Sequence, residues 1–189
     1  MRTDIASLRE VPFGLLRPSA VVDFVLLFGC GKPAVRLLID GDDGVNALSD
    51  WCREVGLDFA VDNSRFACVA REPGASWQIL ETDRLAEPHE IELGQALGYP
   101  TCCCQRIALI GESGIDAYAA EVAGWHFHGN YRLINPAGYG SGQALISHLP
   151  CSPDCDASLA IARVARRFVL AHAAEPALVE LSRSAVVQA

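Results

Sequence analysis

The sequence predicts an α+β fold. We expect residues 1–87 to form a small N-terminal β-rich sheet layer with one helix, and residues 88–189 to form a helical half that carries the cysteine motifs. In the first part, short apolar runs alternate with turn residues, as is typical of buried strands. After Pro88, alanine and leucine dominate and the apolar residues recur at helical spacing. A chain of 189 residues is long enough for one core, so the two parts are predicted to be subdomains of one compact unit.

Five short segments of the first part are predicted strands, because each is apolar and most are bounded by glycine, proline or polar turn residues. They are residues 21–28, 34–39, 57–61, 66–70 and 77–80. The tetrapeptide DNSR at residues 62–65 has the composition of a hairpin loop, so we expect the third and fourth of these strands to pair.

Residues 45–55 are the one helix predicted in the first part, because their apolar residues share one helical face and Gly56 ends the pattern. In the second part, helical spacing predicts a helix after Pro100 that carries a run of cysteines. The other predicted helices are residues 90–97, 113–123, 152–172 and 175–187. Residues 124–142 contain five glycines and are predicted to be a loop.

Composition and charge exclude several classes of protein. Hydrophobic residues make up 51% of the chain and charged residues 20%, which is typical of a globular domain and not of a disordered chain. The formal net charge is −8 and the chain has no basic block, so we expect no nucleic-acid partner. No apolar run reaches about 18 residues, which predicts no membrane span. Because the N-terminus lacks the features of a signal peptide, we expect a cytoplasmic protein with reduced cysteines. The expected partner is a small-molecule substrate. The oligomeric state is left open.

Five of the eight cysteines fall in two short clusters, which are the main chemical signal of the sequence. Three consecutive cysteines follow a Gly-Tyr-Pro turn at residues 102–104, and Cys151 and Cys155 follow His148 in the segment HLPCSPDC. Clustered thiols of this kind bind soft metals or act as nucleophiles. The remaining cysteines stand alone in apolar runs and are predicted to be core residues: Cys30, Cys52 and Cys68.

Local sequence signals suggest how each cluster is presented. Ser152 is predicted as the N-cap of the long helix, with Pro153 at its first position and Cys155 near its third. A thiolate there gains from the helix dipole and from free N–H groups, which lower its pKa. Neighbouring residues on a helix point about 100° apart, so at most two of Cys102, Cys103 and Cys104 are expected to face one centre.

The leading hypothesis is a metalloprotein with a cysteine-ligated centre, because thiolates select zinc or iron–sulfur clusters over hard cations. We predict a 4Fe–4S cluster bound by Cys103, Cys151 and Cys155, with an open iron position that supports lyase or sulfur-handling chemistry. Cys102 is either a fourth ligand or a neighbouring thiol, and His148 is a proton donor or a substrate contact.

Two alternatives remain open at the level of sequence. In the first, the protein is a metal-free thiol enzyme in which Cys155 or Cys151 is the nucleophile and His148 is the base. In the second, four cysteines close a zinc tetrahedron in a non-catalytic interaction module. The segment WHFH at residues 125–128 adds two histidines on one face of a loop, where a pocket wall and a folded loop core are equally compatible with the pattern.

The two motifs resemble the signatures of an uncharacterised prokaryotic family, domain of unknown function 483. The resemblance rests on LGYPTCC at residues 97–103 and on HLPCSPDCDAS at residues 148–158, and it covers about residues 90–167. It implies that five residues belong to one site: Cys102, Cys103, His148, Cys151 and Cys155. Cys104 departs from the pattern, where an apolar residue is expected, and the family supplies no established reaction.

Overall fold

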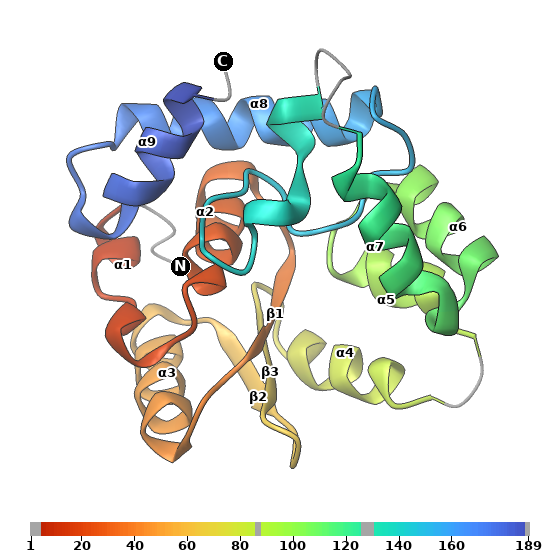
Figure 1. Ribbon diagram of the computed structural model, residues 1–189. Helices are drawn as coiled ribbons and strands as arrows, with labels where there is room; N and C mark the ends of the chain where they lie inside the picture. Colours follow the sequence, from red (N-terminus) through yellow and green to blue (C-terminus); the bar gives the residue numbers. More distant parts are fainter. Residues whose placement is uncertain (1–4, 86–87, 126–130, 188–189) are drawn as a thin grey trace.

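The computed structural model describes residues 5–85, 88–125 and 131–187, and it has an α+β architecture (Figure 1). A three-stranded sheet lies in the first part of the chain, and helices make up most of the rest. The α-helices are α1 (Ile5–Arg9), α2 (Ser19–Cys30), α3 (Asp42–Val55), α4 (Ala75–Asp83), α5 (Glu90–Ala96), α6 (Thr101–Ile110), α7 (Ile115–Ala123), α8 (Asp156–Ala171) and α9 (Val179–Val187). Short 3₁₀ turns are η1 (Phe13–Leu15), η2 (Glu112–Gly114), η3 (Tyr131–Ile134), η4 (Pro136–Gly138) and η5 (Pro176–Leu178). The predicted fold class is confirmed.

The sheet has the strand order β1-β3-β2 and is antiparallel throughout. Its strands are β1 (Ala34–Leu38), β2 (Asp58–Val61) and β3 (Phe66–Ala70). The predicted hairpin joins β2 to β3, and the Asp62 carboxylate accepts a hydrogen bond from the Phe66 N–H across its turn. Three of the five predicted strands are therefore present at nearly the predicted places.

Two predicted strands are helices instead, for a different reason in each case. Residues 21–28 lie in α2, which is buried almost all round because it contacts both β1 and α8. A helix enclosed on all sides shows a continuous apolar run, just as a buried strand does. Residues 77–80 lie in α4, where Asp58 accepts hydrogen bonds from the N–H and hydroxyl of Ser76 at the start of the helix. The first part therefore holds more than the one predicted helix.

A large hydrophobic core extends from the first helix to the last, and a second, smaller one lies between the sheet and α4. Buried side chains of α2, α3 and the sheet pack together with those of α8 and α9. Figure 1 shows α8 and α9 crossing above α2, while α5, α6 and α7 form a second group of helices beside the sheet. In the described part of the chain, no helix is both long and apolar enough to cross a membrane.

Candidate metal centre

Four cysteine thiols from two distant segments meet in one cluster. Their sulfur atoms all lie within 4.8 Å of one another. Cys102 and Cys103 come from the first turn of α6, while Cys151 and Cys155 come from the segment that leads into α8. The sulfur of Cys155 lies 3.7 Å from that of Cys102 and 3.7 Å from that of Cys103, and the last two are 4.0 Å apart. These four thiols can together hold a metal ion.

The two segments present their thiols at helix N-termini. Pro100 precedes α6 in an extended conformation, and its carbonyl accepts hydrogen bonds from the N–H groups of Cys103 and Cys104. Cys155 is itself the N-cap of α8, so its carbonyl accepts the first helical hydrogen bond, from Leu159. The prediction of Ser152 as N-cap was wrong, because residues 152–154 form a turn that is closed by a bond from the Cys155 N–H to the Ser152 carbonyl. Both helix dipoles favour negative charge at this end, as thiolates require.

The third cysteine of the run does not join the cluster. The Cys104 sulfur contacts the Tyr99 carbonyl at 3.7 Å and packs against Gly94 of α5. Helical geometry therefore divides the run as expected, with two residues facing the centre and the third facing the neighbouring helix. The isolated cysteines also behave as predicted: Cys52 and Cys68 are fully buried, and Cys30 is half-buried against α8.

Ser158, a buried residue in α8, connects the thiols to His148. Its hydroxyl donates to the Cys155 sulfur at 3.3 Å and lies 3.5 Å from the Cys103 sulfur. It also lies 2.8 Å from Nε2 of His148. Since the hydroxyl proton is used by a sulfur, the hydroxyl oxygen accepts the Nε2 proton of a neutral imidazole. His148 thus lies behind Ser158 and outside the group of four sulfurs.

The surroundings shift the pKa values of the thiols in opposite directions. Burial raises the pKa of Cys103, and it raises that of Cys151 to about 11. Burial acts on Cys155 in the same direction, but hydrogen bonds from Ser158 and from neighbouring thiols outweigh it and lower the pKa of Cys155 to about 7. Of Cys103, Cys151 and Cys155, the last is therefore the thiol most readily deprotonated.

His148 is held neutral by its position. Its side chain is only 9% exposed, and burial together with the positive charge of Lys32 lowers its pKa to about 3. The ring lies 5.3 Å from the Tyr99 ring, measured between centroids. A neutral imidazole is the form that can donate through Nε2 and accept through Nδ1.

A buried ion pair lies next to this group. The Lys32 ammonium is 3.6 Å from the Asp23 carboxylate and donates to the Ser147 hydroxyl at 2.8 Å. The Tyr139 hydroxyl donates to the other oxygen of Asp23 at 2.5 Å, and the ammonium lies 4.7 Å from the centre of the Tyr99 ring. These contacts compensate two charges that would be costly to bury alone.

Sequence reasoning missed this ion pair and Ser158. Asp23 lies inside the predicted strand 21–28, and Lys32 lies between that strand and the predicted strand 34–39. A single carboxylate in the middle of an apolar run was the available signal, since a buried charge needs a partner. Ser158 offered no comparable signal, because its role depends on which helical face meets the cysteines.

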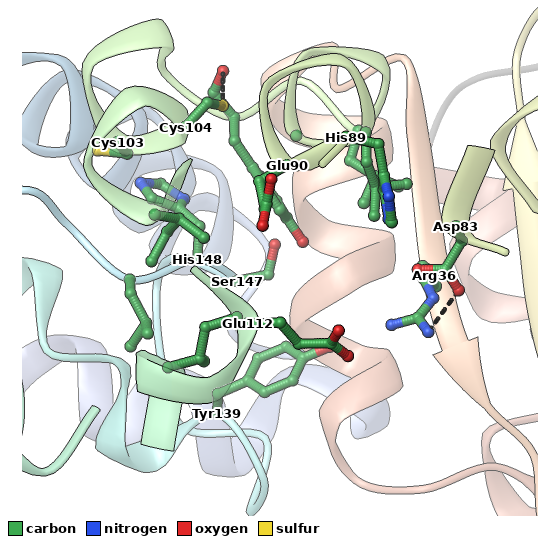
Figure 2. A pocket seen from close by; sticks show the side chains of 17 residues that line it. Arg36, Asp83, His89, Glu90, Cys103, Cys104, Glu112, Tyr139, Ser147 and His148 are labelled. Atoms are coloured by element: carbon green, nitrogen blue, oxygen red, sulfur yellow. Dashed lines mark hydrogen bonds and ion pairs between the residues drawn. The ribbon is translucent and has the colours of Figure 1, made fainter. Parts of the chain in front are cut away.

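A cavity of about 460 Å³ adjoins the cluster and extends toward β1 (Figure 2). Tyr99, Ser147 and His148 form one wall, together with Cys103 and Cys104. The apolar lining comes from residues of α5, α6, α7 and the segment before Cys151: Leu93, Leu97, Ile107, Ile115 and Leu149. Cys103 therefore belongs to both the cluster and the cavity lining. His148 also lines the cavity, and it is linked to the cluster through its hydrogen bond to Ser158.

The opposite wall of the cavity carries charged side chains. Arg36 of β1 and Asp83 of α4 form an ion pair of 2.6 Å. His89, Glu90 and Glu112 also line the cavity (Figure 2). The segment at residues 125–128, for which a pocket wall and a folded loop core were left open, lies largely outside the described residues. Trp125, which is described, packs its ring on Tyr118 and Tyr131.

Comparisons of the chain with protein-family models, with curated proteins and with solved structures gave no match. The resemblance to domain of unknown function 483 stays a prediction based on two motifs. The chemistry of the donor set remains the basis for any functional conclusion: four clustered thiols, a buried serine that donates to them, and a cavity beside them.

Proposed function

We propose that the four thiolates bind a single metal ion, zinc, and that this centre fixes the wall of a small-molecule site in the adjoining cavity. The sulfur separations are the observation that supports the proposal. Four sulfurs at about 2.3 Å from a tetrahedral zinc ion lie about 3.8 Å from one another. The separations of 3.7, 3.7 and 4.0 Å among Cys102, Cys103 and Cys155 are close to that value, and the Cys151 sulfur lies within 4.8 Å of the other three.

The same separations favour one ion over the 4Fe–4S cluster expected from the sequence. In such a cluster each cysteine binds a different iron, so the sulfurs stand roughly 6 Å apart. The thiols would have to separate by about 2 Å to accept it. Four sulfur ligands on one ion also leave no open position, so lyase or sulfur-handling chemistry at the metal does not follow from this arrangement.

In the proposed arrangement, the chain holds the ion with residues from two separate segments of its helical half. Cys102 and Cys103 fix the start of α6, and Cys151 and Cys155 fix the start of α8. When bound, zinc would supply a cross-link between these helices and would keep the thiols deprotonated. Ser158 then orients Cys155, and His148 keeps Ser158 in place from the cavity side.

Metal analysis of the purified protein and of two cysteine variants tests this proposal. We expect one zinc ion per chain, with no visible absorption band from iron. Cys103→Ser should lose most of the metal, because it removes one of the four ligands. Cys104→Ser is the matched control, since the neighbouring thiol contacts Tyr99 and Gly94 instead, and it should keep the full zinc content. Iron and sulfide in stoichiometric amounts, or equal metal loss in the two variants, would overturn the proposal.

A second candidate is the metal-free thiol enzyme, and one observation favours it: the hydrogen-bonded chain from His148 through Ser158 to Cys155. To remove a proton from the thiol, this chain would need the other imidazole tautomer, in which Nε2 accepts from Ser158 and the hydroxyl accepts from Cys155. However, Cys155 is only 5% exposed, whereas Cys102 is exposed. Alkylation of the purified protein distinguishes the candidates, because fast modification of Cys155 supports the enzyme and protection of all four thiols until a chelator is added supports the zinc centre.

A further inference from the structure

The cavity beside the cluster carries negative charge that the described residues do not compensate. Its lining includes three carboxylates and one guanidinium, and the guanidinium of Arg36 is already paired with Asp83. Glu90 and Glu112 have no hydrogen bond or ion pair with any residue in the described part of the chain. Behind the other wall, Lys32 is paired with Asp23 and adds no net charge.

These two carboxylates come from different elements and share the cavity (Figure 2). Glu90 is the first residue of α5, and Glu112 opens η2 between α6 and α7. The helix dipole accounts for a carboxylate at the start of α5, but it does not account for a second carboxylate facing the same space. Two like charges that share a cavity repel one another and favour a cation between them.

A second feature of the cavity points to a bound molecule. His148 is about nine-tenths buried and lines the cavity, and only its Nε2 is used by Ser158. No described residue hydrogen-bonds its Nδ1. This nitrogen is not fully buried, so a ligand group in the cavity can reach it and pair it.

The remaining lining defines the body of the ligand. Most of it is aliphatic, from Leu93, Leu97, Ile107, Ile115 and Leu149. A volume of about 460 Å³ falls within the range of small-molecule sites. We propose that the cavity binds a small molecule with an apolar body and a protonated amine, with the amine held by Glu90 and Glu112. This inference rests on the proposed small-molecule role of the cavity, but not on the identity of the metal.

The test uses cyclohexylamine as the probe, with cyclohexanol and cyclohexanecarboxylate as matched neutral and anionic probes. Binding to the full-length, metal-loaded protein is measured by saturation-transfer NMR at millimolar concentrations. We expect cyclohexylamine to bind more tightly than cyclohexanol. Cyclohexanecarboxylate should show no saturation-transfer signal. Added salt should weaken the binding of the amine, because the attraction between the amine and the two carboxylates is electrostatic.

Glu90→Gln and Glu112→Gln should each weaken amine binding by at least about threefold, and the double variant by about tenfold. Glu92→Gln is the control, because Glu92 is exposed on α5 and does not line the cavity, and it should bind as the wild type does. Zinc content is measured on the same samples and should not change. A lack of amine binding, an equal affinity for the carboxylate, or unchanged binding in the double variant would overturn the inference whatever the metal content.

Discussion

Ser158 has two thiols and an imidazole within reach of one hydroxyl group. It donates to the Cys155 sulfur, approaches the Cys103 sulfur and accepts from His148. Groups that hydrogen-bond a metal ligand orient it and tune its charge, and their loss typically weakens metal binding by about 10–100-fold. The strength of metal binding should therefore depend on a residue that is not itself a ligand.

Ser158→Ala tests this dependence. We expect the variant to bind zinc at full stoichiometry but about 10–100-fold more weakly, because both sulfurs lose their hydroxyl partner. Competition with a chromophoric chelator measures the affinity. Ser152→Ala, in the turn before Cys155, is the control and should show the wild-type affinity. An unchanged affinity in Ser158→Ala would contradict the role assigned to the hydroxyl.

His148 should make stability depend on pH below neutrality. The folded protein keeps the ring neutral because its pKa is lowered to about 3, whereas the unfolded chain protonates it near the ordinary value of 6.5. The contribution of the neutral ring is complete above pH 6.5 and is lost as the pH falls from there toward 3. Between pH 7 and pH 5 the expected loss is about 2 kcal/mol of unfolding free energy.

Urea unfolding at several pH values measures this loss in the wild type and in His148→Gln. The variant should show a flatter pH dependence than the wild type, while His172→Gln, at the end of α8, should keep the wild-type slope. All three proteins are measured without metal, because His148 positions Ser158 and the variant would otherwise differ from the wild type in metal release at low pH. Parallel curves for the wild type and His148→Gln would contradict the neutral buried imidazole.

The residues of the cluster could be predicted from sequence to different extents. Cys102, Cys103, Cys151 and Cys155 were all expected at one site, because clustered thiols are uncommon outside metal or redox sites. The number of metal ions could not be predicted, since it depends on sulfur separations that no spacing along the chain determines. The ion pair of Asp23 and Lys32 was missed because Asp23 lay in a predicted strand, whereas it lies in α2 and Lys32 lies just past the end of that helix.

At the scale of elements, α2 and α8 depend on a close approach at Gly29. A Cβ atom added there would lie 2.5 Å from the Phe168 ring of α8, which is far inside van der Waals contact. The two helices therefore pack at a distance that only glycine permits. This contact connects the central helix to the helix that carries Cys155 at its N-cap.

Gly29→Ala should destabilise the protein by about 1–3 kcal/mol, because the ring and the helix must shift to admit a methyl group. Gly14→Ala is the matched control, since a Cβ at Gly14 meets no atom within 4 Å and the change should be close to neutral. Chemical unfolding of the two variants and the wild type measures the difference. Equal stabilities of the two variants would show that α2 and α8 can separate at little cost.

The misassigned elements show what a single sequence lacks. α2 and the strands have the same apolar composition, and only the burial of α2 on opposite sides explains why it has no polar face. α4 begins where the carboxylate of Asp58, in β2, accepts a hydrogen bond from the N–H of Ser76. Neither cause is local, whereas α3, with one apolar face and Gly56 at its end, was predicted closely because its signals are local.

At the scale of the whole molecule, the metal centre should contribute to global stability. The four thiols come from segments about fifty residues apart, and the core around them includes helices from both ends of the chain. A ligand that binds only the folded state stabilises it, by about 4 kcal/mol when its free concentration is about a thousand times its Kd. The α+β class was predictable from composition and periodicity. The meeting of the two distant segments was predictable only from the two cysteine motifs.

Chelation should therefore lower the melting temperature of the wild type by several degrees and restore it when zinc is added back. Cys103→Ser, which lacks one ligand, should melt at the chelated wild-type temperature and should not respond to chelator. Cys104→Ser should respond as the wild type does. Calorimetric scans of the three proteins, with and without chelator, provide the comparison. A wild type that is indifferent to chelator would contradict a structural contribution from the metal.

The number of ions held by the four sulfurs is tested most directly by X-ray absorption of the purified protein. The spectrum reports which element is bound and its ligand distances. We predict zinc with four sulfur neighbours at about 2.3 Å and no metal neighbour. Iron with a second iron in its near environment, or a metal bound mainly by nitrogen or oxygen, would contradict a single ion held by Cys102, Cys103, Cys151 and Cys155.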